Sequence, residues 1–104
     1  MIRIFVEYSK ESVSSIKIKG HGSGEKGYDI VCAGVSSCFV GGLNNLKQIS
    51  SFDISIVSGD SYCNIIDTVS DHDSIVLETM IVMFETIADS YPKDVKIEVS
   101  RKEG

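Results

Sequence analysis

Short runs in which apolar and polar residues alternate recur along this chain, and they constrain its fold more than any other feature. In residues 2–8, IRIFVEY, the apolar residues Ile2, Ile4 and Val6 fall on one side, and a period of two is typical of a strand. Ile and Val number 25 against 3 Leu, so the apolar residues are mostly β-branched and favour strands. We expect strands over residues 2–8, 13–19, 53–58, 62–67 and 94–100.

Two longer segments fit helices instead. Residues 30–48 place Val31, Val35, Phe39, Gly42 and Leu46 on one stripe. Their small residues lower intrinsic helicity, by roughly 1 kcal/mol for each glycine, so the helix needs a closely packed neighbour.

The second helix is expected to begin near Ser70, which precedes Asp73 by three residues as in a capping box. It runs to about Ser90 and ends before Tyr91 and Pro92. Its apolar residues cover more than one stripe, which favours burial in a homodimer interface. A helix laid centrally against a curled sheet would explain the same pattern.

The resulting order is β-β-α-β-β-α-β, an α+β fold in which two helices pack on a mostly antiparallel sheet. With 104 residues, the chain has the length of one small domain, residues 1–104.

Charge and composition narrow the classes of function. The chain has 10 basic and 15 acidic residues and no basic stripe, so we expect no direct nucleic-acid binding. An acidic surface suits a basic partner. We expect no membrane partner and a cytoplasmic location, because the chain has no apolar run of about 20 residues and no signal-peptide pattern. The three unevenly spaced cysteines indicate reduced thiols rather than disulfides.

The segment that begins at Gly20 reads GHGSGEKGYDIVCAGVS and is the most informative for function. It is expected to place His21 at the end of a strand, then a mobile glycine-rich loop, then Asp29 at the N-cap and Cys32 in the first turn of a helix. Both the helix dipole and a nearby histidine stabilise a thiolate. The alternative is that Cys32 is a small buried residue and His21 a solvated loop residue.

Other potential sites are weaker. Cys38 and Cys63 are expected to be buried, and His72 to be a solvated residue at a helix start. The glycine-rich loop lacks the Gly-Lys-Ser/Thr spacing of a phosphate-binding loop. The cysteines and histidines lack the paired spacing of zinc sites, so no metal or other cofactor is expected.

The same segment resembles the ribosomal-processing cysteine protease Prp family. The family motif is a Gly-His pair, a glycine-containing loop, and then Asp-Ile-Val-Cys-Ala followed by small residues and Ser. This chain has Gly20-His21, Gly27 and the run from Asp29 to Ser36. The likeness continues into the second helix, where the chain reads LETMIVMFETIADSY. One departure is Gly22, where the family usually has Ala, which would loosen the loop.

The resemblance implies a cysteine endopeptidase with Cys32 as nucleophile and His21 as general base and acid. Asp29 would orient His21 or only cap the helix. Together with the physical argument, this predicts that the backbone amide near Ala33 stabilises the oxyanion, and that a substrate loop containing Gly20, Gly22, Gly24 and Gly27 closes over the peptide.

The substrate implied is the N-terminal extension of a basic ribosomal protein, number twenty-seven of the large subunit, cut after an aromatic residue. A non-catalytic, dimeric, ribosome-associated binding module with the same fold remains the alternative.

Overall fold

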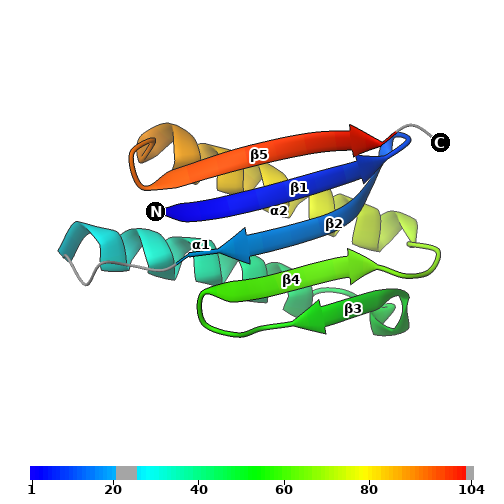
Figure 1. The fold of residues 1–104 in the computed structure, drawn as a ribbon. Helices are drawn as coiled ribbons and strands as arrows, with labels where there is room; N and C mark the ends of the chain where they lie inside the picture. Colours follow the sequence, from blue (N-terminus) through cyan, green and yellow to red (C-terminus); the bar gives the residue numbers. More distant parts are fainter. Residues whose placement is uncertain (21–25, 103–104) are drawn as a thin grey trace.

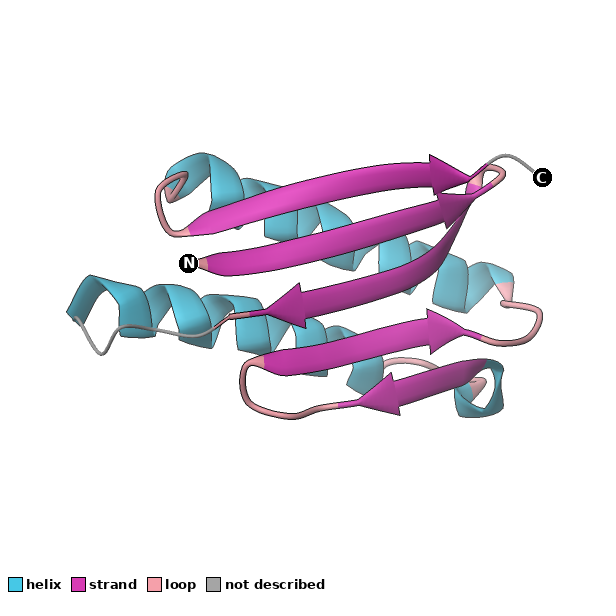
Figure 2. Ribbon diagram, viewed as in Figure 1, coloured by secondary structure: helices cyan, strands magenta, loops and turns pink. Residues whose placement is uncertain are grey.

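Five strands form one sheet, and two helices cover one of its faces. The computed structural model describes residues 1–20 and 26–102, with the backbone alone for residues 26–29. The elements are β1 (Ile2–Ser9), β2 (Ser12–Lys19), α1 (Lys26–Asn44), a short 3-10 helix (Ile49–Ser51), β3 (Phe52–Ser55), β4 (Asp60–Ile65), α2 (Asp71–Ser90) and β5 (Val95–Lys102). Figure 1 shows both helices behind the sheet, and Figure 2 separates them from the strands by colour.

The strand order is β3-β4-β2-β1-β5. The pairs β1–β2, β2–β4 and β3–β4 are antiparallel, whereas β5 returns after α2 to lie parallel to β1. The α+β fold, the order of elements and the mostly antiparallel sheet are therefore confirmed.

The alternation seen in the sequence produces the core. In β1, Ile2, Ile4 and Val6 are buried against the helices while the residues between them lie on the other face. Because alternate strand residues share a face, one apolar face per strand suffices when helices cover one side only. The buried side chains of the sheet and helices form a single cluster, which includes Ile16, Cys63, Val95, Val31, Val35, Phe39, Leu43, Leu77, Met80 and Phe84.

Small residues allow the two helices to approach closely. A Cβ at Gly42 would overlap the side chain of Met80, so a larger residue here would force Met80 to shift where α1 meets α2. The expectation that α1 needs a close neighbour is confirmed at this point.

Several boundaries differ from those expected. Helix α1 begins at Lys26 and ends at Asn44, so the expected range of 30–48 was wrong at both ends. Helix α2 begins and ends as expected: the Ser70 side chain accepts a hydrogen bond from the Asp73 amide, and the helix stops at Ser90. Strand β3 ends at Ser55 rather than at residue 58, which releases the next residues from the sheet.

Candidate active site

Cys32 is half-buried and lies on the wall of a groove between α1 and the β3–β4 connection. The groove has a volume of about 290 Å³. Its walls are mainly apolar, with Ser36, Asp60 and two further serines among the polar contributors. The full lining is Ile2, Ile18, Gly20, Cys32, Val35, Ser36, Phe39, Val40 and residues 56–61.

The β3–β4 connection is held in shape by its own hydrogen bonds. The Val57 amide donates to Ser61 Oγ at 3.1 Å, and the same hydroxyl donates to the Val57 carbonyl at 2.9 Å. The Asp60 amide donates to the Val57 carbonyl at 3.0 Å, which closes the turn. Val57 is therefore fixed beside the groove at three points.

The same turn is joined to the residue that precedes His21. The Gly20 amide donates to the Gly59 carbonyl at 3.0 Å. Both glycines have positive φ, 94° at Gly20 and 81° at Gly59, a region that side chains disfavour. A Cβ at Gly20 would also overlap the Met1 carbonyl oxygen. The backbone that leads into the predicted catalytic segment is thus hydrogen-bonded to the β3–β4 connection, which forms one wall of the groove. His21, Gly22 and Gly24 lie outside the described residues.

The start of α1 corrects two expectations. Gly27 lies in the first turn of the helix rather than in a loop, because α1 begins at Lys26. Asp29 is the fourth residue of the helix and not its N-cap. Residues 26–29 were not expected to be helical because they adjoin glycine-rich sequence, but in the structure they are the first four residues of α1.

The earlier start also changes the positions of Cys32 and Ala33. Cys32 lies in the second turn of α1, not the first. The Ala33 amide follows it, and in an α-helix such an amide donates to the carbonyl four residues earlier. Cys32 is therefore further from the unpaired amides of the helix N-terminus than the sequence suggested.

The other two cysteines lie in different environments from Cys32. Cys63 is fully buried in β4, as expected, and burial together with the Asp53 charge raises the pKa of its thiol to about 11. Cys38 is only half-buried, so the expectation of a buried thiol was wrong, although burial still raises its pKa. Neither lines the groove.

His72 and Asp73 join α2 to the segment that follows α1. The Asp73 carboxylate has no exposed surface and accepts hydrogen bonds from the amides of Lys47 and Gln48, both at 2.9 Å. Burial alone would raise the pKa of Asp73, but these amides, the nearby His72 and Ser70 lower it below its usual value. His72 Nε2 lies 3.0 Å from the Asn45 carbonyl oxygen, so His72 contacts this segment and is not simply solvated.

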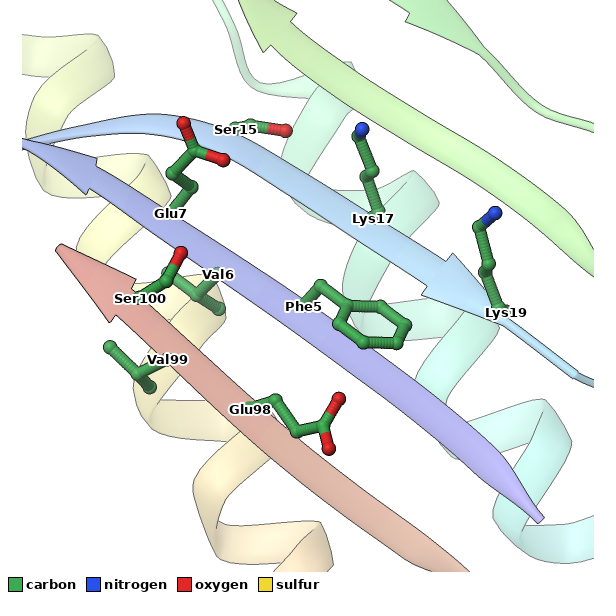
Figure 3. A pocket seen from close by; sticks show the side chains of 9 residues that line it. All are labelled: Phe5, Val6, Glu7, Ser15, Lys17, Lys19, Glu98, Val99 and Ser100. Atoms are coloured by element: carbon green, nitrogen blue, oxygen red, sulfur yellow. The ribbon is translucent and has the colours of Figure 1, made fainter. Parts of the chain in front are cut away.

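A second hollow lies on the open face of the sheet, away from both helices (Figure 3). Phe5 lies across its middle, and Glu7, Lys17, Lys19 and Glu98 stand around it. None of the nine residues that line it is a cysteine or a histidine. It therefore lacks a nucleophilic thiol or an imidazole base.

Within residues 1–20 and 26–102, no three His, Cys, Asp or Glu side chains come together as metal ligands would. Among the helices that the structure describes, neither is long and apolar enough to cross a membrane.

Residues 56 and 57 were not recognised from the sequence as part of the site. Ile56 and Val57 were assigned to a strand, but they follow the end of β3 and are exposed. The signal was the adjacent apolar pair, which interrupts the alternation begun by Ile54.

Comparison with known proteins identifies the family of this chain. The family described as Cysteine protease Prp matches residues 1–96. The ribosomal processing cysteine protease Prp of Staphylococcus aureus is 31% identical over 103 residues, which covers 93% of this chain and 97% of the relative.

Solved structures agree with the family match. The S. aureus Prp protease in complex with a substrate peptide has a TM-score of 0.82 at 29% identity, covering 95% of this chain and 99% of that one. The same protease with a covalently linked product peptide gives 0.80 at 30% identity, with the same coverage. The chain therefore belongs to the Prp family of cysteine proteases.

Proposed function

We propose that this protein is the endopeptidase that removes the N-terminal extension of large-subunit ribosomal protein number twenty-seven, with Cys32 as nucleophile and His21 as general base and acid. One observation carries the proposal: of the three cysteines, Cys32 alone lines the apolar groove. A relative 31% identical is named for ribosomal processing, which supports the substrate class. The net charge of -5 suits a basic substrate protein.

The proposed reaction has two steps. The Cys32 thiolate attacks the scissile carbonyl carbon and forms a C–S bond, and His21 gives a proton to the amine that leaves as the C–N bond breaks. Water then attacks the thioester, which releases the new carboxylate and restores the thiol. His21 follows Gly20, whose amide is bound to the groove wall, which supports a base close to Cys32.

Two supporting roles follow from the position of α1. The correction at the helix start removes the N-cap role of Asp29 and leaves its proposed role of orienting His21. The Ala33 amide remains the proposed oxyanion donor. Because Ala33 is the eighth residue of α1, that role requires its helical hydrogen bond to be released when substrate binds.

The direct test is the intact mass of the unprocessed ribosomal protein after incubation with this enzyme. We expect the wild-type protein to remove the extension and Cys32→Ser to leave it in place. Cys38→Ser is the matched control, because Cys38 lies on the same helix but outside the groove, and this variant should still cleave.

The other outcomes distinguish the alternatives. If wild type fails to cleave, the substrate assignment is wrong, and the non-catalytic binding module becomes the better description. If Cys32→Ser cleaves as fast as wild type, Cys32 is not the nucleophile. A binding module would also bind the precursor equally well with Cys32 intact or replaced.

We also infer that the protein is a homodimer that buries the outer face of α2. Ile75 and Val82 are exposed on this helix, two turns apart, and they flank Thr79. Ile75 and Thr79 also line a shallow apolar groove between α1 and α2. Sedimentation of wild type and of Ile75→Lys tests this inference: a lysine there should shift the protein toward monomer, and a wild-type monomer would contradict it.

A further inference from the structure

Charge is distributed unevenly between the sheet and the helices. Residues 2–19 and 95–102, which include β1, β2 and β5, contain seven Lys or Arg residues against three Glu. Helix α2, on the covered face of the sheet, contains five acidic residues and no Lys or Arg (Figure 1). The three strands and α2 therefore carry opposite charge, and the net charge of -5 does not describe the open face of the sheet.

Strand pairing brings four of these cations together on the open face. Arg3 of β1 pairs with Lys96 of β5 on one side and with Lys19 of β2 on the other. Lys17 precedes Lys19 by two residues, so it lies on the same face in the next row. All four residues are exposed, and we call them the basic patch. The linear sequence shows no basic stripe because the patch is assembled from three strands.

Nearby carboxylates neutralise only part of the basic patch. Glu98 Oε1 lies 4.0 Å from both Arg3 Nη1 and Lys96 Nζ, so one carboxylate is shared by two cations. Asp60 of β4 pairs with Lys19 in the sheet. Within residues 1–20 and 26–102, neither lysine of β2 forms an ion pair. These two lysines therefore keep their charge for an anionic ligand.

Two aromatic side chains lie in the same region. The pairing places Phe5 of β1 beside Lys17, and Lys17 beside Tyr62 of β4. The two aromatic residues are half-buried and lie two strand spacings apart, about 10 Å. Figure 3 shows Phe5 across the middle of a hollow of about 460 Å³, with Lys17 and Lys19 along one side. A planar ligand can therefore reach Phe5 beside a free ammonium group.

Rings that alternate with ammonium groups on an open sheet fit a single strand of RNA. Unpaired bases stack on aromatic side chains, while basic side chains follow the phosphates. A sheet whose exposed aromatic residues stack two or three bases is a common RNA-binding surface. An acidic peptide supplies anions for the lysines but no bases for the rings. Double-stranded RNA keeps its bases stacked on one another and presents mainly phosphates and sugars.

We propose that the open face of the sheet is a docking site for single-stranded RNA, in which Phe5 and Tyr62 stack on bases and Lys17 and Lys19 contact phosphates. The choice of RNA rests on the proposed function, because a protease that processes a ribosomal protein works beside ribosomal RNA. The hollow shares no lining residue with the groove beside Cys32, so RNA and the peptide under attack bind at different places.

The test measures binding of a fluorescein-labelled, single-stranded RNA of about 12 nucleotides to the full-length protein by fluorescence anisotropy. We expect saturable binding at low salt that weakens as salt is added. Replacing both lysines, Lys17→Gln with Lys19→Gln, should weaken binding. It should also reduce the slope of log affinity against log salt concentration by about 1.4, because each phosphate contact contributes about 0.7. No binding by wild type at low salt would overturn the proposal.

The matched control replaces two other exposed lysines, Lys10→Gln with Lys47→Gln. Lys10 lies in the turn between β1 and β2 and Lys47 follows α1, so neither lines the hollow. This variant changes the net charge by the same amount and should bind RNA nearly as wild type does. Equal weakening in both double variants would show an effect of net charge alone and would overturn the proposal.

Ring variants test whether bases are stacked. Phe5→Leu keeps an apolar side chain but removes the ring, and we expect it to bind single-stranded RNA roughly tenfold more weakly. Tyr62→Leu is the second ring variant, and circular dichroism checks that both are folded. Duplex RNA of the same sequence should bind less tightly to wild type and should not respond to Phe5→Leu. If neither ring variant weakens binding, the face recognises negative charge only, and the RNA proposal is wrong.

Failure of this proposal is distinguishable from failure of the proposed function. If wild type cleaves the ribosomal precursor but does not bind RNA, the docking site is wrong and the protease assignment stands. If wild type binds RNA with the expected dependence on the rings and lysines but does not cleave, the docking site stands and the proposed function is wrong. Cys32→Ser should bind RNA as wild type does, because Cys32 does not line the hollow.

Discussion

In two places in this molecule a helix packs beside a neighbouring connection. At one place the polar groups are satisfied within the chain, and at the other apolar side chains stay exposed. At the start of α2, the carboxylate of Asp73 is fully buried and is met by the amides of Lys47 and Gln48. Beside α1, by contrast, apolar residues 56 and 57 remain exposed next to a half-buried thiol. We call the first region, residues 45–48 with 70–73, the Asp73 clamp, and the second the Cys32 groove.

The difference shows how structural and functional sites can be told apart. The polar groups of the Asp73 clamp are satisfied by the chain itself, so nothing is left for a ligand to bind. In the Cys32 groove the backbone of the turn is satisfied, but the apolar wall is not covered. Unmet burial of apolar surface, rather than the number of polar side chains, is therefore the feature that supports the Cys32 groove as the proposed substrate site.

The largest expected effect is in thiol reactivity. In the folded protein Cys32 should be alkylated on the order of 10³-fold faster than Cys63, because Cys63 reacts only when the core opens. The raised thiol pKa of Cys63, about 11, slows it further near neutral pH. Mass spectrometry of iodoacetamide-labelled peptides over time measures this ratio.

Denaturant is the control for that measurement. Once the chain is unfolded, the three cysteines should react at similar rates. Equal labelling of Cys32 and Cys63 in the folded state would contradict the distinction between groove and core.

Next in size is removal of the clamp. Asp73→Ala leaves two amides without their buried acceptor, and we expect the free energy of unfolding to fall by about 2–4 kcal/mol. Urea denaturation followed by circular dichroism measures the change. Asp71→Ala is the matched control at the exposed first residue of the same helix, and it should cost less than about 1 kcal/mol. Equal losses in the two variants would mean that the clamp adds no stability.

The clamp also predicts a pH dependence. The pKa of Asp73 in the folded protein lies below the usual value of an aspartate. The carboxylate therefore contributes stability that is fully present well above the usual pKa of an aspartate and is lost as the pH falls through the folded-state pKa. Asp73→Asn should lack this part of the acid-induced loss. Urea denaturation measured from neutral pH down into the acid range would reveal it, and identical dependence of the unfolding free energy on pH in both proteins would refute it.

The smallest expected effect concerns Gly59, which links the groove wall to Gly20. Gly59→Ala places a side chain at φ 81° and should cost about 1–2 kcal/mol. Gly59→Asn should recover part of that stability, because asparagine tolerates a left-handed backbone.

A positioning role of Gly59 would be detected by its effect on kcat. If the Gly59–Gly20 hydrogen bond positions residue 21, Gly59→Ala should lower kcat at a temperature where the variant is folded, and Gly59→Asn should restore it. A variant that is folded and fully active would show that the link is only structural.

Most of the fold could be predicted from the sequence, because local residue patterns indicate where the strands and helices lie. Alternation over residues 2–8 placed Ile4 and Val6 in the core, and the Ser70–Asp73 spacing located the start of α2. The parallel pairing of β5 with β1 was not predicted, because the residue pattern of a strand does not determine the direction of the strand that pairs with it.

The site was predicted only in part. Cys32 was singled out because its motif is local; the structure places it on the wall of a groove, and its role as nucleophile stays a prediction. The groove wall was missed because Ile56 and Val57 fit a strand in isolation, and their exposure depends on where β3 ends. The clamp was missed because Asp73 is met by backbone amides, which every residue carries and no side-chain pattern reveals.

The contact between Met1 and Gly20 has a practical consequence for handling this protein. The backbone of the first residue lies close to the backbone that leads into the predicted catalytic segment, because a Cβ at Gly20 would overlap the Met1 carbonyl oxygen. A purification tag fused ahead of Met1 would emerge next to that segment and compete with substrate for space. The last strand instead ends beside Ser9, at the opposite end of β1 (Figure 1). Affinity tags, fluorophores and surface attachments therefore belong at the C-terminus in every assay described above.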